Sequence, residues 1–146
     1  MNNKKTHESI LEKFGFPNSV IMEYKHWYWL LRPEQITLGS GIIITKDFCP
    51  SLTELEKNKF DELFCIYNDV EKKLKEKFNF DKINYLMLMM KDPTLHYHVI
   101  PRYSSESIFM DNCFIDKGYP GIPEFKNCNK YSHDDFTAIK KHIIEE

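Results

Sequence analysis

The sequence lacks the long apolar segments that mark membrane and secreted proteins. It contains no apolar run of roughly 18 residues, the length that a spanning helix needs. Its first 14 residues are charged throughout, whereas a secretory signal carries an apolar centre. We therefore expect no membrane association and a cytoplasmic location.

The sequence also lacks a strong charge of either sign. The formal net charge is −2, and lysines alternate with acidic residues instead of forming a basic block. A nucleic-acid backbone binds to clustered positive charge, so a nucleic-acid partner is not expected. A small anionic ligand held by a few local groups remains possible.

Cysteine is sparse and unpaired. The four residues Cys49, Cys65, Cys113 and Cys128 are far apart and form no C-x-x-C pair of the kind that binds zinc or does redox chemistry. In a reducing compartment such cysteines act as small buried hydrophobic residues, and we expect no disulfides.

Internal repeats, low-complexity tracts and Gly/Ser linkers are absent as well, so nothing in the 146 residues marks a domain boundary. A chain of this length is close to the usual size of one domain. Hydrophobic residues make up 42% of it, enough for a folded core. We expect a single domain over residues 1–146.

Several segments carry the patterns of β-strands. Residues 19–31, SVIMEYKHWYWLL, predict one or two strands that end before Pro33, and residues 42–45 predict a short third strand. Residues 83–90, INYLMLMM, predict a strand that is apolar on both faces, with its methionines filling the core. The next segment, 94–102, should pair antiparallel with it.

Two segments carry a helical pattern. Apolar residues recur at helical spacing from 51 to 78, where Ser51 and Glu54 fit a capping box and Asn79 fits a left-handed stop. A short final helix is expected to begin after Ser132. Together the elements predict an α+β fold in which one long helix lies on an antiparallel sheet.

The chemistry-bearing feature is the stretch KDPTLHYHVIPRY, residues 91–103. Alternate side chains of a strand share one face, so His96 and His98 are displayed together with Thr94, while Leu95 and Val99 face the helix-covered core. Two imidazoles on one face are unusual for a strand that merely decorates a surface. Buried imidazoles bonded to backbone groups are the other structural interpretation.

Three chemistries could use this pair. A metal site would need further ligands, but His7, His26, His133 and Cys113 have no ligand-like spacing, so no metal is expected. A serine or cysteine nucleophile would need a G-x-S-x-G type of context, which is missing. The third option is a histidine nucleophile that attacks phosphorus while its neighbour hydrogen-bonds the phosphoryl oxygens.

The segment TLHYHVIPR, residues 94–102, resembles the signature of the histidine triad (HIT) family, His-φ-His-φ-His-φ-φ with φ apolar, often followed by Pro-Arg. The resemblance covers about residues 20–103 and leaves residues 104–146 as an unmatched tail. It implies a five-stranded antiparallel sheet with one long helix, usually paired in a homodimer. It also implies a purine nucleotide substrate, no cofactor, and a covalent nucleotidyl intermediate on His96, with His98 touching the transferred phosphate.

This sequence departs from the HIT pattern at the positions that surround the histidines. Thr94 stands where the first histidine of the signature belongs, and the usual glycine-rich segment before it is reduced to MMKDP. Ser40 follows Gly39 where histidine is frequent, and Arg32 stands where a ribose-binding Asn or Asp is customary. We treat Thr94, Ser40 and Arg32 as candidate substrate-binding residues.

Two functions are compatible with these residues. The first is a nucleotidyl hydrolase or transferase for a dinucleoside polyphosphate or a nucleoside phosphoramidate. The alternative is a catalytically weak nucleotide-binding module of the same fold, favoured by Thr94 and the shortened loop. Arg102 is expected to serve strand-end packing or a dimer contact, without a catalytic role.

Overall fold

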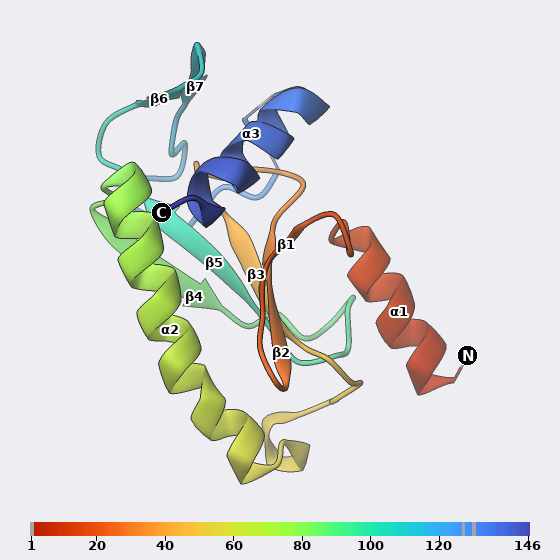
Figure 1. The fold of residues 1–146 in the computed structure, drawn as a ribbon. Helices are drawn as coiled ribbons and strands as arrows, with labels where there is room; N and C mark the ends of the chain where they lie inside the picture. The colour runs from red at the N-terminus through yellow and green to blue at the C-terminus, as the bar shows by residue number, and fades with distance from the viewer. Residues whose placement is uncertain (1, 127, 130) are drawn as a thin grey trace.

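The computed structural model of the chain describes residues 2–126, 128–129 and 131–146 and contains a five-stranded antiparallel sheet with helices on both faces (Figure 1). The helical elements are α1 (Asn3–Lys13), the short 3-10 turn η1 (Leu52–Glu54), α2 (Lys57–Phe78) and α3 (His133–Ile144). The strands of the sheet are β1 (Val20–Glu23), β2 (Trp27–Leu31), β3 (Gly41–Thr45), β4 (Lys82–Leu86) and β5 (His96–Arg102). The predicted α+β class, with its long helix and short C-terminal helix, is confirmed.

The strand order places the histidine strand inside the sheet. The order is β1-β2-β3-β5-β4, and β5 is paired antiparallel with β3 on one side and β4 on the other. Ile44 lies opposite His96 and Ile42 lies opposite His98. A strand that is hydrogen-bonded on both edges holds its side chains in fixed directions, so the two imidazoles have a rigid base.

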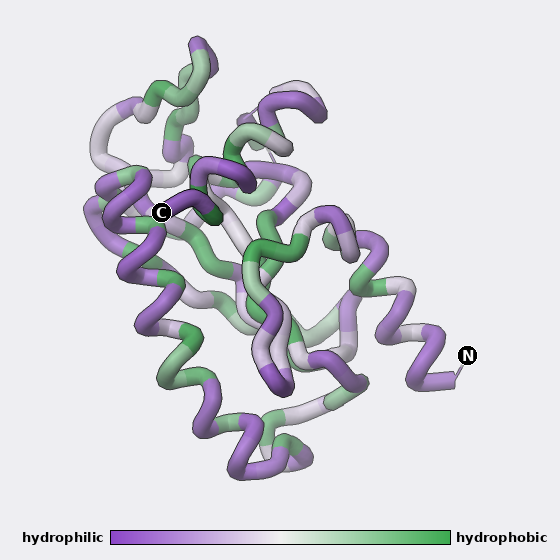
Figure 2. Tube along the Cα trace, viewed as in Figure 1, coloured by the Kyte–Doolittle hydropathy of each residue, from purple (hydrophilic) through white to green (hydrophobic). Residues whose placement is uncertain are grey.

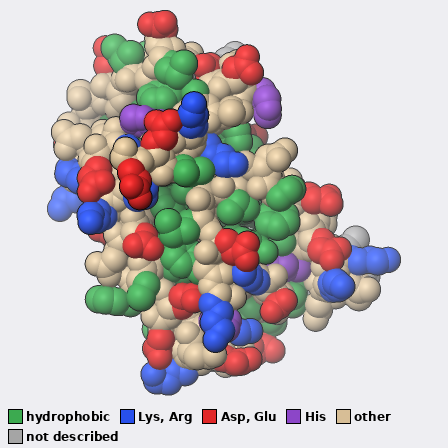
Figure 3. Space-filling view, viewed as in Figure 1, with side chains coloured by type: hydrophobic (Ala, Val, Ile, Leu, Met, Phe, Trp, Pro, Cys, Tyr) green, Lys and Arg blue, Asp and Glu red, His purple; other side chains and the backbone are tan. Residues whose placement is uncertain are grey.

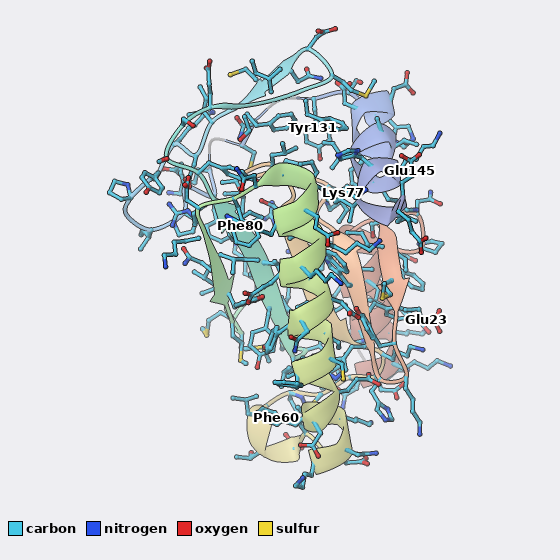
Figure 4. The ribbon with its side chains drawn as sticks, turned by 60° about the vertical axis from the view of Figure 1, so that its left-hand side comes forward. Glu23, Phe60, Lys77, Phe80, Tyr131 and Glu145 are labelled. Carbon is cyan, nitrogen blue, oxygen red and sulfur yellow. The ribbon has the colours of Figure 1, made fainter. Side chains whose placement is uncertain are left out.

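One face of the sheet packs on α2 and forms the main hydrophobic core. Trp27, Trp29 and Val99 from the strands are fully buried against residues of α2 that include Ile66 and Leu74. The turned view shows α2 lying across the near face of the sheet, with Phe60 toward its first turns and Lys77 toward its end (Figure 4). Leu95 and Val99 belong to this core, as the alternation of β5 predicts.

The opposite face of the sheet packs on α1. Ile10, Leu11 and Phe14 form a second buried cluster with Leu30, Ile42 and Ile44 of the strands. The apolar positions of α1 are few and confined to this side, so most of the helix is hydrophilic (Figure 2). The sheet thus separates α1 from α2 (Figure 1), and the face that carries His96 and His98 lies beneath α1.

The long helix begins later than the sequence predicts. Ser51 does contact Glu54, but its hydroxyl donates to the Glu54 carboxylate at 3.1 Å and makes no backbone cap. Leu55 then adopts an extended conformation, so the turn η1 stays separate and α2 starts at Lys57. The predicted left-handed stop at Asn79 (φ 51°, ψ 51°) and the Ser132 cap of α3 are confirmed.

The strand predicted over residues 83–90 ends at Leu86. Beyond it Met87 and Met89 pack on the core from a loop, whereas Leu88 points outward and Met90 is 91% exposed. The second half of the apolar run is therefore a loop, and its methionines Met87 and Met89 pack on the core. The prediction that Met90 fills the core is wrong.

The cysteines do not form the buried set that composition predicts. Cys49 is buried, but Cys128 is half-buried, Cys65 is exposed on α2, and Cys113 is exposed on a hairpin formed by β6 (Ser107–Phe109) and β7 (Asn112–Phe114). The reason is that a shift of one residue moves a side chain from the buried to the exposed side of a helix or hairpin, and the small cysteine side chain is tolerated on both sides. All four thiols are free.

Arg102 ends β5 in a buried ion pair with Asp116 of the segment after β7. Arg102 Nε donates to Asp116 Oδ2 at 2.7 Å and Arg102 Nη2 donates to Asp116 Oδ1 at 3.1 Å. Arg102 Nη1 donates to Asn84 of β4 at 2.8 Å. The side chain therefore serves strand-end packing, one of its two predicted roles.

None of the described helices is both long and apolar enough to cross a membrane.

Candidate functional site

His96 is held in one tautomer by the backbone next to it. Its Nδ1 lies 2.7 Å from the main-chain carbonyl oxygen of Thr94. A carbonyl oxygen only accepts, so the proton of the neutral ring belongs on Nδ1 and the lone pair on Nε2. His96 Nε2 is buried without a hydrogen-bond partner among the described residues. The ring thus carries an uncommitted nucleophilic nitrogen.

His98 lies beside His96 and is kept neutral. The ring centroids are 5.1 Å apart and the planes stand nearly at right angles. Burial lowers the pKa of His98 to about 4, and the charges of a protonated His96 and of Arg32 act in the same direction. Asp92 raises this pKa and Lys13 lowers it, both by smaller amounts. His98 is therefore an uncharged imidazole at neutral pH.

Aromatic side chains from two parts of the chain enclose the imidazoles. The Phe14 ring centroid lies 5.7 Å from that of His96 and 6.2 Å from that of His98. Phe125, in the segment before α3, packs edge-on against His98 with centroids 5.4 Å apart. His96 is fully buried and His98 is 7% exposed, so the site is closed in this conformation.

The Thr94 side chain is buried and hydrogen-bonded, and it contacts His7, which the sequence did not predict to lie at the site. Its hydroxyl oxygen lies 2.9 Å from Nδ1 of His7 in α1 and accepts the backbone N–H of Cys49 at 3.2 Å. Thr94 is fully buried and His7 is 4% exposed. Burial lowers the pKa of His7, although the backbone carbonyls of Thr45 and Lys46 favour its charged form.

Arg32 borders the imidazoles from the end of β2. Its guanidinium carbon lies 5.7 Å from the Phe125 ring, and its Nη1 donates to the carbonyl of Glu34 at 2.8 Å. Arg32 Nε is buried without a partner among the described residues. A guanidinium with a free donor next to a neutral imidazole is suited to a phosphate oxygen.

One hollow is lined by Arg32, and a second hollow lies next to it. A small one of about 130 Å³ is lined by Lys13, Phe14, Arg32, Pro33 and Glu34. A larger one of about 760 Å³ shares Pro33 and Glu34 with it and extends over the tail, where Tyr131 and Phe136 stack with centroids 6.4 Å apart. Neither hollow is lined by His96 or His98.

Ser40 serves the loop between β2 and β3. Its hydroxyl donates to the carbonyl of Thr37 at 2.7 Å and accepts the backbone N–H of Thr37 at 2.9 Å. Two more hydrogen bonds hold this loop. The Tyr103 hydroxyl donates to the carbonyl of Leu38, and the Gln35 side chain accepts the backbone N–H of Gly39. Ser40 is fully buried, so its hydroxyl is engaged in holding the loop beside Arg32.

Potential metal ligands and charged side chains are dispersed among the described residues. Over residues 2–126, 128–129 and 131–146, no three His, Cys, Asp or Glu side chains gather in a group that could hold a metal ion. Acidic and basic side chains are interleaved on the face shown in Figure 3, without a broad basic patch.

The neutral state of His98 predicts a loss of stability in mild acid. In the unfolded chain its pKa returns to about 6.5, so between pH 6.5 and about 4 the unfolded state binds a proton that the folded state excludes. The free energy of unfolding should fall by up to about 3 kcal/mol over this range. His98→Gln should show a shallower fall, measured by urea unfolding at pH 7 and pH 4.5. Equal slopes for both proteins would contradict the assignment.

The imidazole pair was predicted from the sequence, but the side chains that enclose it were not. His7, Phe14 and Phe125 touch the site and were not predicted to do so. The spacing of His7, Ile10, Leu11 and Phe14 at i, i+3, i+4 and i+7 is a helical pattern that would have indicated α1. Phe125 lies in irregular structure and carries no such signal.

Comparison with known proteins places this geometry in context. The family model described as "HIT domain" matches residues 14–105. Searching the curated proteins returns no match. Among solved structures, a histidine triad protein from Marinobacter aquaeolei VT8 is similar with a TM-score of 0.73 and 20% identity, over 94% of this chain and 90% of that one.

Two further solved structures share the fold. A histidine triad (HIT) protein from Sinorhizobium meliloti 1021 has a TM-score of 0.71 and 21% identity, over 93% of this chain and 92% of that one. A histidine triad protein from Bradyrhizobium japonicum has a TM-score of 0.67 and 17% identity, with coverage of 95% and 96%. These matches cover 93 to 95% of this chain, whereas the family model stops at residue 105.

Proposed function

The chain belongs to the HIT family, and on that basis we propose that it is a nucleotidyl hydrolase or transferase in which His96 is the nucleophile. The substrate is a purine nucleoside phosphate derivative, of the dinucleoside polyphosphate or nucleoside phosphoramidate type. The observation that carries the proposal is the free Nε2 of His96, on a ring whose Nδ1 is fixed by the Thr94 carbonyl.

The reaction proceeds in two displacements. In the first, the Nε2 lone pair of His96 forms a bond to phosphorus, and the bond from phosphorus to the leaving group breaks, so the leaving group departs with its electron pair. In the second, a water or alcohol oxygen bonds to phosphorus and loses a proton, while the N–P bond breaks and returns the electron pair to Nε2. No residue of this chain is oxidised or reduced.

His98 and Arg32 act on the phosphoryl group during these steps. Negative charge on the phosphoryl oxygens is stabilised by donors that are already in place and shielded from water. His98 is neutral and rigidly held beside His96, and Arg32 has a free Nε at the same edge. We propose that His98 donates a hydrogen bond to the phosphoryl oxygens and that Arg32 binds the phosphate chain.

Substrate entry requires the aromatic cover to move. Phe14 belongs to the end of α1 and packs in a buried cluster, whereas Phe125 lies outside helices and strands. Phe125 is therefore the part of the cover that opens at lower cost, and it contacts Arg32, which lines the small hollow.

The proposed activity can be tested with diadenosine polyphosphates and adenosine phosphoramidate. We expect release of AMP, and after acid quenching a mass increase of one adenylyl group on the peptide that contains His96. Turnover without any adduct, or an adduct on another residue, would overturn the assigned nucleophile. Absence of both turnover and adduct with all substrates would overturn the enzymatic function.

The alternative is a binding module that holds a nucleotide without turning it over. It is favoured by the complete burial of His96 and by the absence of a histidine at position 94. Calorimetry with AMP and phosphorus NMR with the substrates above separate the two: binding without product formation supports the module.

We also propose that the chain forms a homodimer. β4 is at the edge of the sheet, and the loop after it exposes Leu88 and Met90. An edge strand with unpaired backbone groups beside apolar side chains is a surface that a second copy can cover. Sedimentation equilibrium measures this directly.

A further inference from the structure

Among the residues that the structure describes, His7 is the one histidine that bonds to the site from outside the segment matched by the family model. It lies in α1, before residue 14, and its Nδ1 is 2.9 Å from the hydroxyl of Thr94. We propose that His7 restores a third imidazole to the site and acts as a positioning residue for His96. This inference rests on the proposed role of His96 as the nucleophile.

The directions of the hydrogen bonds at the Thr94 hydroxyl follow from its donors and acceptors. The Thr94 oxygen accepts the backbone N–H of Cys49, and its single O–H proton needs an acceptor. Nδ1 of His7 is the acceptor within reach among the described residues. His7 is then a neutral ring with its proton on Nε2, an atom that is buried without a hydrogen-bond partner among the described residues.

Thr94 transmits this contact to the nucleophile. Its side chain is bonded to His7 and its main-chain carbonyl accepts the Nδ1–H of His96 at 2.7 Å. The side chain of Thr94 is thus held by His7 and by Cys49, and the peptide plane of its carbonyl is held by the Leu95 N–H, which donates to the carbonyl of Cys49 at 2.7 Å. The tautomer of His96, and with it the lone pair on Nε2, depends on this hold.

Helix α1, which carries His7, makes a second contact with the segment that precedes β5. Lys13 forms an ion pair with Asp92 at 2.8 Å, two residues before Thr94. The face of α1 that bears His7 also bears Phe14, which packs on both His96 and His98. One helical face therefore bonds Thr94 at one end and covers the imidazoles at the other.

A merely structural His7 would satisfy a buried hydroxyl and do nothing more. The two roles differ in what they do to His96. If His7 only fills space, its loss lowers stability but leaves the His96 proton on Nδ1. If it positions His96, its loss lets the Thr94 carbonyl shift and the proton distributes over both ring nitrogens.

The first test reads the tautomer and needs no activity. In the full chain labelled with ¹⁵N histidine, the two ring nitrogens of His96 report which one carries the proton. We expect a pure Nδ1–H form in the wild type and a mixture in His7→Ala and in Thr94→Val, which keeps the packing of α1 but removes the hydroxyl. His7→Asn, whose amide oxygen can accept the Thr94 proton, should restore the Nδ1–H form. Glu8→Ala, on the exposed side of α1, is the matched control and should match the wild type.

A pure Nδ1–H form of His96 in both folded His7→Ala and folded Thr94→Val would overturn the inference. Because this readout does not depend on turnover, it separates failure of the inference from failure of the proposed function.

The second test follows the covalent step with the substrates named above. We expect His7→Ala to lower the single-turnover rate of adduct formation about 10- to 100-fold, since a small displacement of a reacting group has effects of this size. KM should change little, and His7→Asn should recover most of the rate. Adding Thr94→Val to His7→Ala should cost little more, because both act through one contact. A loss confined to KM, or unchanged rates in folded His7→Ala, would contradict a positioning role.

Discussion

Replacing His96 with asparagine is expected to lower the rate of nucleotide release by about four orders of magnitude or more, because the nucleophile itself is removed. Asparagine fills most of the buried space, so the fold should survive, as circular dichroism can verify. His98→Gln removes one hydrogen-bond donor to the phosphoryl group and should cost less, about 10²- to 10³-fold. Steady-state release of AMP and acid-quenched adduct formation measure both effects.

The matched control for this result is another histidine away from the site. His26 lies in the turn between β1 and β2, and it engages its surroundings through its backbone. His26→Asn should keep the wild-type rate. Should His96→Asn release AMP within tenfold of the wild type, a different group performs the displacement.

The second large effect concerns stability. Asp116→Ala is expected to lower the free energy of unfolding by about 3–5 kcal/mol, because it leaves the Arg102 charge buried without its partner. The two side chains are only 5% and 1% exposed, and the pair is bidentate. Asp116 also accepts the backbone N–H of Tyr103 at 3.2 Å, which adds a second unsatisfied donor in the variant. Urea unfolding measures the difference.

Two variants test whether burial is the reason. Asp116→Asn keeps part of the hydrogen bonding and should be less harmful than Asp116→Ala. Asp61→Asn breaks an exposed pair with Lys57, at 2.8 Å, and should hardly change the free energy of unfolding because exposed pairs contribute little. Equal effects of Asp61→Asn and Asp116→Asn would contradict the role assigned to burial.

The sheet and the imidazole pair could be predicted because their signals are local. A strand repeats every second residue, so the side to which His96 points follows from the apolar Leu95 and Val99, and the structure agrees. The end of β4 could not be predicted in the same way. Met87 and Met89 pack on the core from a loop, and an apolar run has the same appearance in a strand and in a loop that returns to the core.

The closure of the site could not be predicted from the sequence because it depends on contacts between distant residues. The spacing of His7 and Phe14 indicates a helix, but they reach the imidazole strand and Thr94 only because α1 folds onto the second face of the sheet. Phe125 reaches His98 through a segment that has no periodic pattern at all. The sequence therefore predicts which groups could react, whereas the access to them is a property of the tertiary structure.

Asn129 has a consequence for how the protein can be divided. Its side-chain amide donates to the carbonyls of Ile36 and Ile115 at 3.0 and 3.1 Å, and its backbone N–H donates to Gln35 at 3.2 Å. A chain cut at residue 105, where the family match stops, would leave these buried acceptors of the β2–β3 loop without donors. We therefore expect the shortened chain to be unstable, and expression of residues 14–105 alone to be a poor route to an active fragment. The end of the family match at residue 105 is therefore not the end of the folding unit.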